Sequence, residues 1–165
     1  MSENRVATMV LLDGLEQARL RFARCEPGTT EAFHAIFEAL AWIGASHNRL
    51  VADGLDRPAI LDGLYYMRNV VIHQGVDVLS WLLFPGSGKL GAASLGAFKL
   101  GGSGPSLEWR WPLVGEFKSP ESPTGTDEYR TMIAGSSVAA TLNDAVTALR
   151  SVRGLSGDAS EEAGI

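Results

Sequence analysis

The chain has 165 residues, of which 45% are hydrophobic and 20% are charged. This composition excludes wholesale disorder, and the length fits one globular domain. The net charge of −5 argues against a broad surface that coats nucleic acid, although a small basic site is compatible with it. Because Cys25 is the single cysteine, an internal disulfide is excluded, and the sequence also lacks the Cys/His spacing of a zinc site.

The N-terminal segment lacks the long apolar core and the cleavage site of a signal peptide. The most apolar stretch, residues 70–85, is interrupted by His73, Gln74 and Asp77, so it does not have the composition of a membrane span. We therefore expect a cytoplasmic protein that does not enter a membrane.

Hydrophobic periodicity predicts two helices in the first third of the chain. The first spans residues 3–24 and ends before Pro27-Gly28. The second spans residues 30–52, with Thr29 or Thr30 as its N-cap. Trp42 lies off the apolar stripe of the second helix, which predicts burial on two sides. The two stripes are Ala7, Leu11, Leu15, Ala18 and Phe22, and then Phe33, Ile36/Phe37, Leu40, Ile43 and His47.

A third helix is predicted over residues 56–84, with Asp56 as its N-cap and Pro85-Gly86 at its end. A fourth is predicted in two pieces. Thr126 caps a short helix over 127–134, and Ser136 or Ser137 caps the next one. The apolar stripe of that last helix is Val138, Leu142, Ala145, Leu149 and Val152.

Residues 85–125, between the third and fourth helices, contain nine of the 19 glycines. Apolar residues alternate with Glu108 and Arg110 here, which predicts a strand. We expect it to pair with residues 95–100 in a β-hairpin that lays its tryptophans on the helices. The apolar residues are Leu107, Trp109, Trp111 and Leu113. The predicted fold is an all-α antiparallel bundle over residues 1–153 with this hairpin inserted, followed by a flexible tail over 154–165.

A helical wheel of the third helix places Arg68 at the centre of the apolar face, with Asn69 and His73 to one side. A buried unpaired guanidinium costs several kcal/mol, so Arg68 must be paired or must line a cleft. Two interpretations are open. Arg68 pairs with a core carboxylate such as Glu38 while His73 lies on the surface, or Arg68 and His73 belong to a functional site.

The string Arg68-Asn69-Val70-Val71-Ile72-His73 resembles the motif of HEPN domains, in which an arginine and a following polar residue precede a histidine on one helix. The segment DEYRTMIAGSSVAATLNDAV is similar to the final-helix region of such chains. The resemblance covers about residues 1–84 and 126–152 and leaves out the glycine-rich insert.

The resemblance implies an all-α homodimer in which two motifs face one cleft. It implies a metal-independent endoribonuclease of a toxin or phage-defence type, with RNA as substrate, a cognate antitoxin as a further partner, and neither metal nor cofactor. His73 would move protons to or from the ribose 2′-hydroxyl and the leaving 5′-oxygen. Arg68 would stabilise the charge on phosphate, Asn69 would orient the reacting groups, and Glu38 would be a supporting carboxylate.

A different class of function is also open, namely a non-catalytic HEPN-like protein that binds a partner protein or small ligand through the same helix face. Fold analogy does not choose between the two.

Other motifs favour structural interpretations. Gly86–Gly91 matches G-x-G-x-x-G but follows a predicted helix rather than a strand, so we do not expect nucleotide binding there. His34 and Glu38 lie one helical turn apart without a third metal ligand. His47 continues an apolar stripe, which indicates a partly buried structural histidine. Trp109 and Trp111 are expected to pack on the bundle rather than stack on bases.

Overall fold

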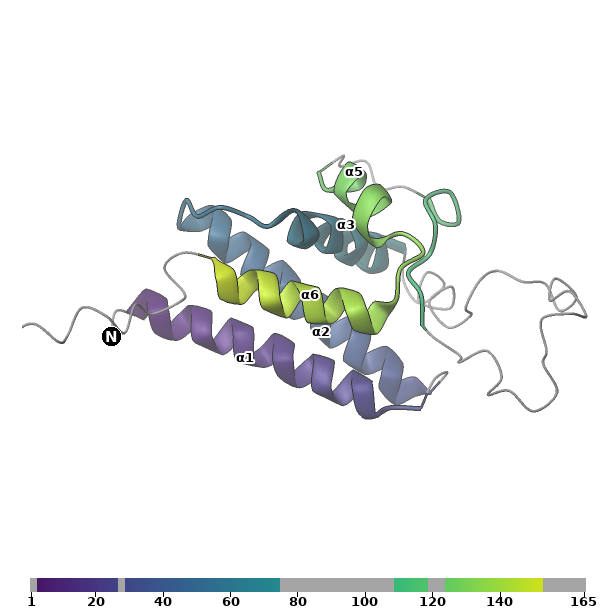
Figure 1. The fold of residues 1–165 in the computed structure, drawn as a ribbon, viewed down its shortest axis with the longest axis horizontal. Coiled ribbons are helices and arrows are strands. Elements are labelled where there is room, and N and C mark those ends of the chain that lie inside the picture. The colour runs from purple at the N-terminus through teal and green to yellow at the C-terminus, as the bar shows by residue number, and fades with distance from the viewer. Residues whose placement is uncertain (1–2, 27–28, 75–108, 119–123, 153–165) are drawn as a thin grey trace, which may run out of the picture.

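The computed structural model describes residues 3–26, 29–74, 109–118 and 124–152. These residues are mostly helical, and no named strand occurs among them. In chain order the elements are α1 (Glu3–Arg24), α2 (Thr30–Ala52), α3 (Ala59–Gln74), α5 (Thr126–Glu128), the π-helical turn η1 (Tyr129–Ile133) and α6 (Val138–Ser151). Figure 1 shows α1 and α6 side by side, with α2 and α3 behind them.

The first two helices have the predicted bounds. Thr29 is the N-cap of α2, and its hydroxyl accepts a hydrogen bond from the Ala32 N–H at 3.3 Å. In α1, Leu15, Ala18 and Phe22 are buried, as the periodicity predicts. The expected burial of α2 on two sides is also confirmed, since α2 contacts both α1 and α3.

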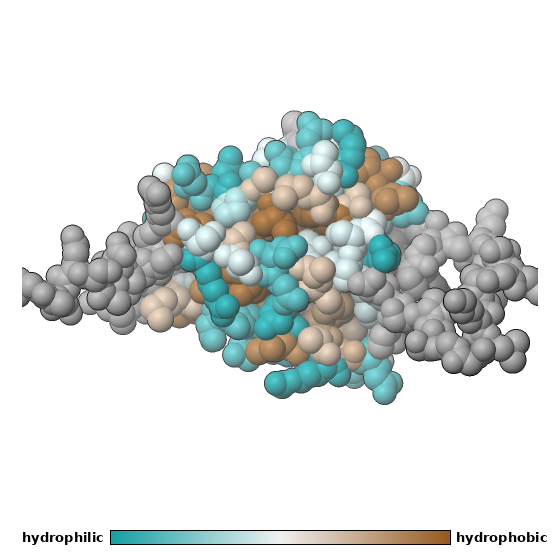
Figure 2. All heavy atoms as spheres, viewed as in Figure 1, coloured by the Kyte–Doolittle hydropathy of each residue, from teal (hydrophilic) through white to brown (hydrophobic). Residues whose placement is uncertain are grey.

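The helices α1 and α2 approach closely where Gly14 of α1 faces the Trp42 ring of α2. A Cβ atom at Gly14 would lie 2.4 Å from the Trp42 indole, so the missing side chain at Gly14 is what admits this ring. Trp42 therefore packs on α1, while the stripe through Leu40 and Ile43 fills the core. The face in Figure 2, which presents α1 and α6, mixes hydrophilic and hydrophobic residues.

The helix α3 begins at Ala59 rather than at Asp56, and Gln74 is the last of its residues that the structure describes. The Leu61 N–H bonds back to the Pro58 carbonyl at 2.8 Å, which starts the helix with a tight turn after proline. The predicted extension over residues 75–84 lies outside the described residues. The buried residues of α3 centre on Met67, with Leu64 and Val71 one turn away on either side.

The segment 109–118, part of the predicted hairpin, does not form a named strand in the structure. Its β pairing there is one isolated antiparallel bridge between Arg110 and Ser137, so the bridge is made to the start of α6. The Trp111 N–H donates to Ser136 O at 3.0 Å, and the Val138 N–H donates to Trp109 O at 2.8 Å. The proposed hairpin partner, residues 95–100, lies outside the described residues.

The expectation that the tryptophans lie on the helices is confirmed. Trp109 and Trp111 are buried, whereas Leu113, predicted for the same face, is 54% exposed. The Trp109 ring meets Phe22 of α1 and Phe33 of α2 edge-on, with centroids 6.0 and 6.3 Å apart. These contacts attach the segment to the end of the α1–α2 pair.

The start of the fourth helical region differs from the prediction. Gly125, not Thr126, is the N-cap, with φ of +82° and no side-chain cap. A Cβ atom at Gly125 would lie 2.0 Å from the Asp62 carbonyl oxygen, so both space and backbone conformation require glycine. Ser137 caps α6, and the predicted stripe from Val138 to Val152 is buried throughout. The predicted tail, 154–165, lies outside the described residues.

A hydroxyl hydrogen bond ties η1 to the segment 109–118. The buried Tyr129 O–H donates to the Pro112 carbonyl at 2.6 Å. Burial, with Tyr66 and Glu116 nearby, raises the pKa of Tyr129 far above its ordinary value. The folded protein therefore holds this phenol in its protonated form.

We expect Tyr129→Phe to lower the free energy of unfolding by about 1–2 kcal/mol near neutral pH, because Pro112 O loses its donor. Because the raised pKa belongs to the folded state, its stabilising effect is present below about pH 10 and is lost as pH rises and the unfolded tyrosine ionises. The wild type should therefore lose more stability than Tyr129→Phe between neutral pH and about pH 10.5. Urea unfolding at both pH values measures this, and parallel losses in the two proteins would contradict it.

Candidate functional site

Polar side chains cross the contact between α2 and α3. His47 of α2 is 4% exposed, and its Nε2 lies 3.0 Å from Oδ1 of Asp62 of α3. Arg57, in the turn between the helices, places Nη1 3.6 Å from the same carboxylate oxygen and 3.3 Å from Nε2. With a proton on Nε2, His47 donates a hydrogen bond to Asp62, and the Arg57 guanidinium lies beside the same carboxylate as an ion-pair partner. Asp62 therefore joins the interhelical turn to both helices.

Aromatic and cationic groups continue this arrangement along α3. The His47 ring stacks on the Tyr65 ring, with centroids 3.9 Å apart and planes 10° from parallel. The Cζ atom of Arg68 lies over the same Tyr65 ring, 5.8 Å from its centroid. We call Asp62, His47, Tyr65 and Arg68 the interhelical column. It runs from the Arg57 turn along the α2–α3 contact to Arg68, which lies beside Gly44.

Arg68 is only partly buried, but its Nε is enclosed and has no hydrogen-bond partner. Its Nη1 donates to Oδ1 of Asn69 at 2.9 Å. Across the helix contact, a Cβ atom at Gly44 would lie 2.9 Å from the Arg68 Nε. Gly44 thus leaves the space that the base of the guanidinium occupies.

The charge of Arg68 has no carboxylate partner within the part of the chain that the structure describes. The predicted partner Glu38 instead pairs with Arg21 of α1. The interpretation of Arg68 as one half of an ion pair with Glu38 is therefore wrong. Glu38 also does not reach Arg68 as a supporting carboxylate.

The position of Arg68 on α3 differs from the wheel prediction. The wheel, which included residues 75–84, placed Arg68 at the centre of the apolar face. In the described part of α3, the buried face is centred on Met67. Since consecutive helical residues are about 100° apart, Arg68 lies at the edge of that face, beside α2. This edge position is why the side chain is half-buried and why part of it faces outward.

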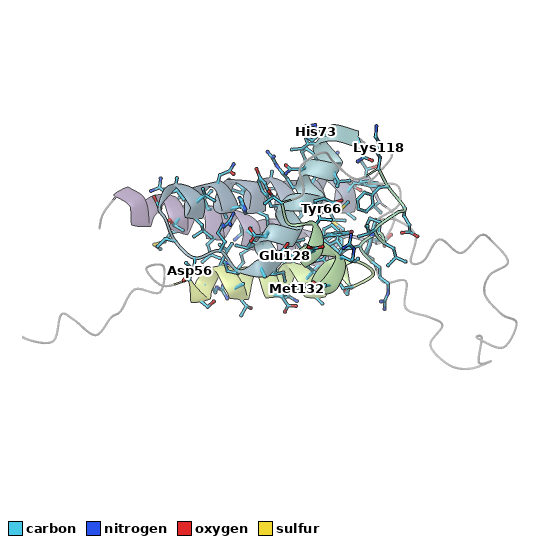
Figure 3. All side chains as sticks on the ribbon, turned by 90° about the horizontal axis from the view of Figure 1, so that it is seen from above. Asp56, Tyr66, His73, Lys118, Glu128 and Met132 are labelled. Atoms are coloured by element: carbon cyan, nitrogen blue, oxygen red, sulfur yellow. The ribbon has the colours of Figure 1, made fainter. Side chains whose placement is uncertain are left out.

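The structure brings Asn69 to Arg68 but leaves His73 apart. His73 is exposed in the last turn of α3, at the edge of the molecule in Figure 3. Residues five positions apart on a helix point about 140° from each other, which separates His73 from Arg68 within one chain. The side-chain amide of the neighbouring Gln74 makes two hydrogen bonds to the Lys118 backbone. Its Nε2–H donates to the Lys118 carbonyl, and its Oε1 accepts from the Lys118 N–H, which attaches the end of the described helix to the segment 109–118.

Exposed apolar side chains lie beside Arg68. Phe37 and Ile72 are each 48% exposed, and Ala41 is exposed between Phe37 and Gly44. Phe37 lies two turns before Gly44 on α2, and Ile72 one turn after Arg68 on α3. The connected helices run in opposite directions with Gly44 beside Arg68, so helical spacing predicts that these side chains lie on one side of the α2–α3 pair. We call Phe37, Ala41, Arg68 and Ile72 the α2–α3 face.

The interhelical column was largely missed by the sequence analysis. It treated His47 as a partly buried structural histidine and did not identify Asp62, Tyr65 or Arg57 as its neighbours. A local signal did exist, because Asp62, Tyr65 and Asn69 recur at helical spacing on α3. The partner helix and the stacked ring are tertiary, and no spacing within the chain gives them.

No protein-family model, curated protein or solved structure matches this chain. Among the described residues, no group of three or more His, Cys, Asp or Glu side chains is arranged to hold a metal ion. Over the same ranges, no helix has the length and apolar character needed to cross a membrane.

The arrangement can bind an anion at Arg68. A guanidinium with free donors, supported by an amide, suits a planar or tetrahedral oxyanion such as phosphate. Proton transfer would require a further group, because His47 is held by Asp62 and His73 points elsewhere within the same chain. Among the described residues of one chain, the anion-binding element is therefore present without an acid or base beside it.

We expect Gly44→Ala to displace the Arg68 side chain while changing the free energy of unfolding by less than about 1 kcal/mol. The added methyl group improves helix propensity by a comparable amount, and the atom it meets belongs to a flexible side chain. Urea unfolding measures the stability, and the ¹H–¹⁵N signal of the Arg68 Nε–H reports the displacement. Ala45→Ser, at an exposed neighbour, is the matched control. An unmoved signal in Gly44→Ala would contradict the close approach.

Proposed function

We propose that this protein is a metal-independent endoribonuclease of a toxin or phage-defence type that acts as a homodimer in the cytoplasm. The observation that carries the proposal is the partly buried guanidinium of Arg68. It lacks a carboxylate partner among the described residues, and two exposed apolar side chains, Phe37 and Ile72, lie within two helical turns of the Gly44–Arg68 contact. The resemblance of Arg68, Asn69 and His73 to the HEPN motif supports RNA cleavage as the reaction.

The α2–α3 face would be the dimer contact. Exposed Phe37 and Ile72 would gain from removal from water, because burial of apolar area is the main driving force in association. Two-fold symmetry makes such a surface meet itself, so both arginines would approach the same axis. We propose that Arg68 of one subunit acts with His73 of the other, since the two residues diverge within one chain.

The proposed reaction cleaves RNA through its own 2′-hydroxyl. The 2′-oxygen forms a bond to the neighbouring phosphorus as the bond from phosphorus to the 5′-oxygen breaks. His73 either accepts the 2′-hydroxyl proton or donates a proton to the departing 5′-oxygen, and solvent water completes the other transfer. Arg68 stabilises the negative charge that develops on the phosphate, and a cleft shielded from water strengthens this contact. Asn69 keeps the guanidinium oriented through its 2.9 Å hydrogen bond. A cognate antitoxin would inhibit the enzyme by blocking the access of RNA to Arg68.

A second candidate is a non-catalytic HEPN-like protein that binds a partner protein or small ligand. The exposure of His73 and its separation from Arg68 favour this candidate, because among the described residues the guanidinium donates its hydrogen bond to the amide of Asn69 and not to an acid or base. In this case Arg68 would bind an anionic group of the ligand, without cleavage.

Cleavage of RNA in the presence of EDTA tests the proposed activity. We expect Arg68→Ala and His73→Ala each to lower kcat by about 100-fold or more, as loss of a transition-state contact or a general acid–base does. Arg24→Ala and His34→Ala, at exposed positions, are the matched controls and should cleave as the wild type does. Equal activity in all five proteins would contradict the assignment. Absence of cleavage, with RNA or protein binding that depends on Arg68, would favour the non-catalytic candidate.

Subunit mixing and light scattering test the shared site. Neither Arg68→Ala nor His73→Ala is active alone, but an equal mixture should recover up to about a quarter of wild-type activity, because half the dimers would carry one intact site. Phe37→Glu with Ile72→Glu should convert the dimer to a monomer and abolish cleavage. Val51→Glu, at a comparably exposed apolar residue near the end of α2, is the control. No recovery on mixing would show that the two residues do not act across subunits.

A further inference from the structure

Arg68 has few direct restraints for a side chain that must hold a fixed position. Its one hydrogen bond goes to Asn69, the next residue of the same helix, and its enclosed Nε has none. An arginine side chain has many rotamers, and a solvent-facing guanidinium would ordinarily sample several of them. Other contacts must therefore define where the guanidinium lies.

Two surfaces supply those contacts. Gly44 leaves a gap in α2 that receives the base of the guanidinium, and a larger residue would collide with it. The Tyr65 ring lies beneath the guanidinium carbon at 5.8 Å, a distance at which the negative face of the ring attracts a cation. The gap limits where Arg68 can go, and the ring favours one position within it.

Tyr65 is itself held by a group from the other helix. The nearly parallel His47 ring covers it at 3.9 Å, and the buried His47 is fixed in turn by Asp62 at 3.0 Å. Arg57 lies beside that carboxylate and completes a continuous series of contacts from the interhelical turn to Arg68. The order of the series is Arg57, Asp62, His47, Tyr65 and Arg68.

We propose that Tyr65 and His47 are positioning residues for the Arg68 guanidinium, with the aromatic stack as the element that sets its location. The assignment rests on the proposed function, in which Arg68 contacts the scissile phosphate. Neither Tyr65 nor His47 touches substrate. The stack acts through the plane of its rings, so the Tyr65 hydroxyl is dispensable and the ring is not.

Paired substitutions separate the ring from the hydroxyl. Tyr65→Phe keeps the ring and should keep the wild-type kcat and the wild-type signal of the Arg68 Nε–H. Tyr65→Leu removes the ring and should lower kcat about 10-fold or more with KM changed less than about 3-fold, because misplacement of a catalytic group acts on the transition state. The Nε–H of Arg68 should also exchange with solvent at least about 10-fold faster in Tyr65→Leu.

His47→Gln provides an independent variant should Tyr65→Leu not fold. Glutamine retains a hydrogen-bonding group for Asp62 but removes the ring that stacks on Tyr65. It should produce the same faster exchange at Arg68, with a cooperative urea transition showing that the protein remains folded. His34→Gln, on the exposed side of α2, is the matched control.

The exchange measurement does not depend on enzyme activity, so the two proposals fail separately. Wild-type protein without RNA cleavage would overturn the proposed function, and the exchange rates would still test the stack. Cleavage that depends on Arg68 but is unchanged in Tyr65→Leu and His47→Gln would overturn the positioning role and leave the activity standing. Equal loss in Tyr65→Phe and Tyr65→Leu would also overturn it, because the hydroxyl would then be the active feature.

Discussion

The burial of α2 on two sides is the constraint on which the rest of the structure depends. Small residues make it possible, since Ala32, Ala35 and Ala39 are fully buried and allow neighbouring helices to approach. On one side Trp42 fits against Gly14 of α1, and on the other Gly44 faces α3. Because a close-packed contact tolerates little change of volume, these positions fix how the three helices lie relative to one another.

That packing determines the environment of Arg68. A guanidinium in the core would require a partner, and one in solvent would be free to move. At the edge of the α2–α3 contact it is partly desolvated, confined by Gly44 and supported by Tyr65. A single helix could not create this intermediate environment. Tyr65 lies on α3 with Arg68, but the confinement by Gly44 and the His47 ring that covers Tyr65 both come from α2.

Much of the fold could be predicted from the sequence. The bounds of α1 and α2 and the buried stripe of α6 were expected from periodicity, which is a local property. Capping preferences narrowed the N-caps of α2 and α6 to two residues each, and the structure selects Thr29 and Ser137. The prediction was wrong at Gly125, where a positive φ and the nearby Asp62 carbonyl decide the cap. Of the two interpretations left open for Arg68, the ion pair with Glu38 is excluded, because Glu38 pairs with Arg21 of α1.

The sequence by itself determined the bounds of α1 and α2 and the buried stripe of α6, because helix formation depends on neighbours within a turn or two of the chain. It also singled out Arg68 as an unusually placed charge. Only the tertiary structure decided that His47 meets Asp62 and stacks on Tyr65, that Gly44 makes room for Arg68, and that His73 points away. Those relations depend on the rotation and spacing of packed helices, which are set by contacts between residues distant in the chain.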